Sequence, residues 1–97
     1  MDGRWVKEAI EVMEEGNPAL LQEMKARPLR FAEWKASLER EAEDLFLRTL
    51  WETKEAEKLP APVTYQDQAA LEAQARAAAT SLVRETLIRP LGIQTVA

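Results

Sequence analysis

The stretch LRFAEWKASLEREAEDLFLRTLWETKEAEKL, residues 29–59, decides the fold because it contains neither Gly nor Pro. Its apolar side chains recur at helical spacing, at Phe31, Trp34, Leu38 and Ala42. A repeat of about 3.6 residues predicts an amphipathic helix whose apolar stripe faces a core. We therefore expect one long helix here, with Phe31 and Trp34 at the start of its buried face.

The second half of this stretch carries more apolar surface than one core-facing stripe needs. Four large side chains, Phe46, Leu47, Leu50 and Trp51, spread over the sector opposite that stripe. A helix that is apolar around more than half of its circumference is normally covered from more than one side. Aromatic-rich patches without Lys are also typical of interface centres. We expect these four residues either to be core within one chain or to form an interface.

Two short helices are predicted on the N-terminal side of this stretch. Residues 4–15 place apolar and charged side chains on opposite faces, which indicates an amphipathic helix. Gly16 is expected to end it in the left-handed conformation that Gly adopts most easily. Asn17 and Pro18 then suit the N-cap and the first position of a second helix, which extends to about residue 26.

A proline-rich connection and a final helix are predicted on the C-terminal side. Residues 59–64 are Leu-Pro-Ala-Pro-Val-Thr, and the two prolines cannot continue a helix. Thr64, followed three residues later by Asp67, suits a helix start. The Ala-rich residues 65–88 are therefore expected to be helical, and residues 90–97 to form a tail.

Together these elements predict an all-α fold in a single domain, residues 1–97. We expect a small bundle of three to four helices, because no segment alternates between apolar and polar residues as a strand would. The two long helices, about 29–59 and 65–88, are expected to form an antiparallel hairpin.

The lack of Cys and His narrows the possible chemistry of the chain. Without these residues it has no disulfide, thiol nucleophile, imidazole base or imidazole metal ligand. No apolar run is long enough to span a bilayer, and the first residues lack the apolar block of a signal peptide. We therefore expect a soluble, cytoplasmic protein without a membrane partner.

Carboxylates on two predicted helices are the strongest candidates for catalysis. Hard ions such as Mg²⁺ bind oxygen ligands, and acidic residues one turn apart can share a metal. Glu41-Ala42-Glu43-Asp44, followed by Leu45-Phe46-Leu47, resembles the Glu-x-x-Asp segment of the all-α nucleoside triphosphate pyrophosphatases of the MazG and dUTPase type. The resemblance implies magnesium-dependent nucleotide hydrolysis. It places the ligands at Glu11, Glu14, Glu41 and Asp44.

The same carboxylates also have a simpler interpretation as solvated charges. The first motif is Glu-x-x-Glu-Glu, at residues 11–15, where the pyrophosphatase family has Glu-Glu-x-x-Glu. Asp44 lies four residues from both Arg40 and Arg48, so opposite charges along one helix face can account for it.

A basic segment around the start of the long helix suggests a second alternative. Its members are Lys25, Arg27, Arg30 and Lys35. Basic residues with nearby aromatic side chains are typical of nonspecific nucleic-acid surfaces. The net charge of −4 opposes attraction to a polyanion, and Phe31 and Trp34 are expected in the core, where they could not stack on bases.

The sequence thus favours a non-enzymatic protein that acts by association with itself or with a protein partner, as small bacterial or phage accessory proteins do. No catalytic residue and no cofactor are expected under this interpretation. The first alternative is the magnesium-dependent pyrophosphatase, and the second is a nucleic-acid-binding accessory protein.

Overall fold

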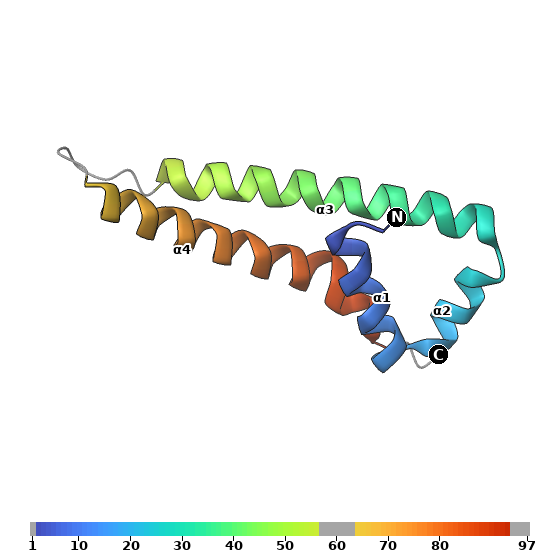
Figure 1. Cartoon of the computed structure of the whole chain (residues 1–97). Coiled ribbons are helices and arrows are strands. Elements are labelled where there is room, and N and C mark those ends of the chain that lie inside the picture. Colours follow the sequence, from blue (N-terminus) through green and yellow to red (C-terminus); the bar gives the residue numbers. More distant parts are fainter. Residues whose placement is uncertain (1, 57–63, 94–97) are drawn as a thin grey trace.

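The computed structural model describes residues 2–56 and 64–93, and this part of the chain is almost entirely helical (Figure 1). The all-α prediction is therefore confirmed, and the described residues contain no strand. The elements in chain order are α1 (Arg4–Gly16), α2 (Pro18–Lys25), α3 (Pro28–Ala56), α4 (Tyr65–Val83), a π-helical turn η1 (Arg84–Ile88) and a 3-10 turn η2 (Arg89–Gly92).

The two long helices, α3 and α4, lie side by side, and α1 packs against the middle of α3 and the turns that follow α4 (Figure 1). The core forms where these three helices meet. Its buried members are Trp5, Val6 and Ala9 from α1, Leu38, Ala42 and Phe46 from α3, Ala79 and Val83 from α4, and Ile88 from η1.

The N-terminus of α1 is capped by a carboxylate from α3. Gly3, at the N-cap, offers no side chain, and the backbone N–H groups of Trp5 and Val6 donate to Glu39 at 3.1–3.3 Å. A Cβ on Gly3 would collide with this carboxylate. The indole Nε1 of Trp5 donates to Glu43 at 2.9 Å, so two acidic residues of α3 fix the position of α1.

A π-helical turn changes the spacing of the buried residues at the end of the last helix. Ala75, Ala79 and Val83 follow one another every four residues along the buried face of α4. The next buried residue is Ile88, five residues after Val83, because the hydrogen bonds of the π-helical η1 span one residue more than those of an α-helix. The predicted helical stretch therefore continues to Ile88, with this change in geometry.

The helix boundaries confirm two predicted starts and correct one predicted end. Asn17 accepts a hydrogen bond from the N–H of Leu20, and Thr64 accepts one from that of Asp67, as predicted. The prediction for Gly16 is wrong, since it lies within α1 without a left-handed φ. Its small size is needed because a Cβ there would collide with the carbonyl oxygen of Gly92.

The segment that contacts Gly16 was expected to belong to a tail. Residues 89–92 instead form η2 and pack against α1, where a Cβ on Gly92 would lie 2.6 Å from Cγ1 of Val12. Any tail therefore starts no earlier than Ile93. Apart from Thr64, the predicted connection at residues 59–64 lies outside the described residues, as does the predicted extension of α3 beyond Ala56.

The molecule is elongated, with a radius of gyration of 17.0 Å and principal dimensions of 56 × 27 × 18 Å. A compact chain of this length would have a radius of gyration of about 12.5 Å. The difference arises because residues 47–56 of α3 and 65–76 of α4 continue past α1, with Leu50 at the inner end still packed against the core (Figure 1). We call these two segments the distal arm. No helix among the described residues is long and apolar enough to cross a membrane.

Candidate functional site

The apolar sector predicted on the long helix divides into a buried part and an exposed part. Phe46 is only 3% exposed, and its ring centroid lies 5.8 Å from that of Trp5. It therefore belongs to the core, and its prediction as an interface residue is wrong. Leu50 is half-buried against the same core. Leu47 and Trp51 are 51% and 63% exposed, and they are one helical turn apart.

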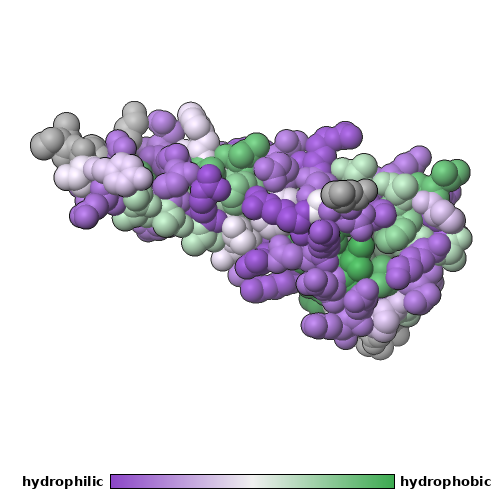
Figure 2. Space-filling view, viewed as in Figure 1, coloured by the Kyte–Doolittle hydropathy of each residue, from purple (hydrophilic) through white to green (hydrophobic). Residues whose placement is uncertain are grey.

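The surface around the distal arm combines apolar and charged areas. Figure 2 shows a green apolar area over α3 within the arm, with purple hydrophilic areas beside it. Tyr65, at the start of α4, is also largely exposed. Glu72 pairs with Lys54 of α3 and accepts a hydrogen bond from Arg76 at 3.1 Å. The hydrogen bond from Lys54 is the main reason why the pKa of Glu72 lies below its ordinary value of 4.5.

The four carboxylates of the predicted magnesium site do not form a metal-binding group. Glu11 and Glu14 are exposed on α1, and Glu41 and Asp44 are exposed on α3. Within residues 2–56 and 64–93, no three acidic side chains are placed to hold a metal ion together. The acidic residues of α3 with a clear role are instead Glu39 and Glu43, which bind the start of α1. No pattern in the sequence indicates that role, because it depends on how α1 crosses α3.

The four basic residues of the predicted segment differ in exposure and in their partners. Lys35 pairs with Asp2 at 3.1 Å, and its Nζ lies 4.8 Å from the ring centroid of Phe31. Lys25 is exposed in the last turn of α2. Arg27 and Arg30 are exposed, and neither has an ion-pair partner among the described residues.

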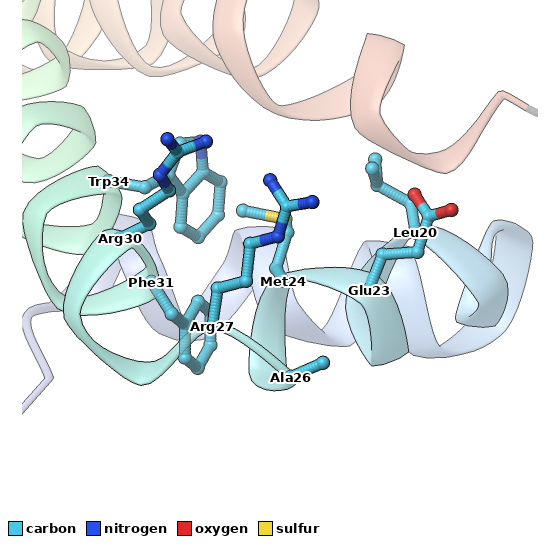
Figure 3. A pocket seen from close by; sticks show the side chains of 8 residues that line it. All are labelled: Leu20, Glu23, Met24, Ala26, Arg27, Arg30, Phe31 and Trp34. Carbon is cyan, nitrogen blue, oxygen red and sulfur yellow. The ribbon is translucent and has the colours of Figure 1, made fainter.

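Arg27 and Arg30 line a cavity of about 490 Å³ between α2 and the start of α3 (Figure 3). Its other walls are formed by Leu20, Glu23, Met24, Ala26, Phe31 and Trp34. The prediction that Phe31 and Trp34 begin the buried stripe is therefore correct only for Trp34, which packs against the core as well as lining the cavity; Phe31 lies outside the core. Both are half-buried, and their rings stack on each other with centroids 6.0 Å apart and planes 14° apart.

The cavity exists because α2 is short and turns away from α3. Pro18 starts α2 and Pro28 starts α3, so only eight residues of helix lie between the two breaks. A helix this short cannot cover the first turns of α3. The spacing of the two prolines was the sequence signal for such an opening, but it does not say which side chains line it.

The side chains in the cavity are chemically suited to bind an anion. In Figure 3 the guanidinium groups of Arg27 and Arg30 lie on the side of Trp34 and Met24, while Glu23 lies at the other end of the cavity. Guanidinium groups form charge-assisted, often paired hydrogen bonds with carboxylates and phosphates.

Comparison of the chain with protein-family models, curated proteins and solved structures gave no match.

Proposed function

We propose that this protein is a non-enzymatic assembly protein that pairs with a second copy of itself through the distal arm. The observation that carries the proposal is the exposure of Leu47 and Trp51, which are one turn apart on the arm and 51% and 63% exposed. Large apolar side chains that lie together on a surface are typical of interaction sites, and Trp is enriched among the residues that dominate binding energy.

The shape of the molecule supports the same proposal. In the described part of the chain, the arm consists of α3 and α4 alone, while α1 packs against the middle of α3 and η1 follows the C-terminal end of α4 (Figure 1). Two helices by themselves bury little apolar surface, and stable helical bundles usually contain more. Two arms packed together would form a four-helix arrangement that covers both copies of Trp51.

Within this proposal, α3 and α4 of each chain form an antiparallel hairpin. Phe46 packs in one cluster with Ala79. Two turns later in α3, Lys54 pairs with Glu72, which is two turns earlier in α4. These two contacts support opposite directions for the helices. A two-fold pair of such hairpins would present the same surface from each copy, as most homodimers do.

Light scattering coupled to size exclusion tests the proposal. We expect the chain to have twice its mass of 11.0 kDa, and the double substitution Leu47→Glu, Trp51→Glu to reduce it to the mass of one chain. The reason is that two carboxylates would be desolvated in the apolar interface. Circular dichroism should show unchanged helix content, since both sites are exposed in the single chain.

The matched control is Leu29→Glu with Ile93→Glu, which changes two exposed apolar residues outside the arm, 83% and 66% exposed. This pair should leave the mass of the assembly unchanged. A wild-type chain that stays monomeric at all accessible concentrations would overturn the proposal. Equal dissociation by the control pair would also overturn it, because the effect would then be one of added charge alone.

A further inference from the structure

We propose that the cavity between α2 and α3 binds a small amphiphilic anion, in which a carboxylate is joined to an apolar chain. The cavity volume of about 490 Å³ lies within the range of small-molecule sites in proteins, about 300–1,000 Å³. Such sites combine apolar walls with a few polar groups that fix the orientation of the ligand, and this cavity has both.

The walls are large apolar side chains that no other part of the described chain fully covers. Leu20 and Met24 come from α2, and Phe31 and Trp34 come from the first two turns of α3. All four are half-buried. A ligand with an apolar chain would remove the rest of their surface from water, which is the main source of favourable free energy for apolar ligands.

The charges in the cavity define which end of the ligand carries the carboxylate. Arg27 and Arg30 supply two guanidinium groups without a partner among the described residues. Arg27 directly precedes α3 and Arg30 is in its first turn, so both lie near the positive end of the helix dipole, which also favours an anion. Glu23 lies at the opposite end of the cavity (Figure 3) and would repel a second anionic group. The arrangement therefore favours one charged head and one uncharged tail.

This inference does not depend on self-association. The cavity lies at the end of α3 that is farthest from the distal arm (Figure 1). Substitutions in one region therefore leave the other region intact, and the two proposals can fail separately.

Octanoate is a suitable probe, and the indole N–H signal of Trp34 in ¹⁵N NMR spectra is a site-specific readout. The signals of Trp5, Trp34 and Trp51 can be assigned with single Trp→Phe variants. We expect octanoate to shift the signal of Trp34 in a saturable manner, with a Kd of about 1 mM or tighter. The signals of Trp5 and Trp51 should not follow this curve.

Two comparisons identify the role of the arginines. Octanamide, which has the same chain without the charge, should bind at least about tenfold more weakly. The double substitution Arg27→Gln, Arg30→Gln should weaken octanoate binding by at least a similar factor while leaving octanamide unaffected. The matched control, Arg40→Gln with Arg48→Gln, removes two exposed arginines of α3 outside the cavity and should change neither affinity.

Several results would overturn the inference. One is the absence of any shift at Trp34 up to about 10 mM octanoate, which is well above the expected Kd. Another is equal binding of octanoate and octanamide, which would mean that only the apolar walls contribute. A third is an equal loss of octanoate affinity in the Arg40→Gln, Arg48→Gln control, which would show that the total charge of the chain, and not the cavity, attracts the anion. Tighter binding of an oligothymidylate at Trp34 would favour a nucleic-acid site instead.

Discussion

The carboxylate of Glu39 should stabilise the whole fold because it caps a helix that is distant in sequence. The substitution Glu39→Ala removes the acceptor for two backbone N–H groups at the start of α1, those of Trp5 and Val6. Loss of a helix cap costs about 0.5–2 kcal/mol, and loss of a negative charge near a helix N-terminus costs about 0.3–1 kcal/mol. The site is only partly buried, so water can replace part of the loss. We expect destabilisation of about 1.5 kcal/mol.

Urea denaturation followed by circular dichroism measures this change. The matched control is Glu41→Ala, because Glu41 is exposed and lies on the same helix without a partner among the described residues. It should change the free energy of unfolding by no more than about 0.5 kcal/mol. Equal effects of the two substitutions would refute the capping role of Glu39.

A second substitution at Gly3 separates the cap from other effects of Glu39. A Cβ on Gly3 collides with the Glu39 carboxylate, so Gly3→Ser should not stabilise the wild-type chain. In the Glu39→Ala background that space is open, and a serine at this N-cap can accept from the backbone itself. There Gly3→Ser should recover about 1 kcal/mol. The same effect of Gly3→Ser in both backgrounds would show that the two positions are not coupled.

Three further predictions concern packing and charge. Gly16→Ala should destabilise the fold by about 1–3 kcal/mol in urea denaturation, despite the higher helix propensity of Ala, because the backbone of Gly92 occupies the space of the new Cβ. Phe46→Ala should cost about 3–5 kcal/mol by the same assay, since the ring is buried in the core. Lys54→Met should raise the pKa of Glu72 toward 4.5 in an NMR titration. Because the pKa of Glu72 is lowered in the folded chain, its pairing with Lys54 stabilises the fold above pH 4.5. This stabilisation is lost as the pH falls through the pKa that Glu72 has in the folded chain.

Local signals in the sequence predicted the helices and their starts well. Asn17 and Thr64 act as caps because their side chains bond to backbone groups three residues later, and such contacts depend on neighbouring residues alone. The π-helical turn at Arg84–Ile88 could not be predicted in this way. It depends on the fit of Ile88 into a core that α1 and α3 complete.

The candidate sites were harder to predict because the sequence does not show how the helices cross. Phe46 and Trp51 looked equivalent in the helical pattern, yet α1 covers the first and leaves the second exposed. Phe31 and Trp34 were expected to be core because they continue the apolar stripe. Both line a cavity, since α2 is too short to cover them, and of the two Trp34 also packs against the core.

The composition of the core has a consequence for how the protein folds during synthesis. The core joins Trp5, near the start of the chain, to Ile88, more than eighty residues later. While the ribosome is still adding α4, the apolar face of α1 has emerged without its final partners. Contacts over such long separations also slow folding, because a large loop must close first. Trp5 and Val6 therefore reach their final surroundings only after Ile88 has left the ribosome and packed against the same core.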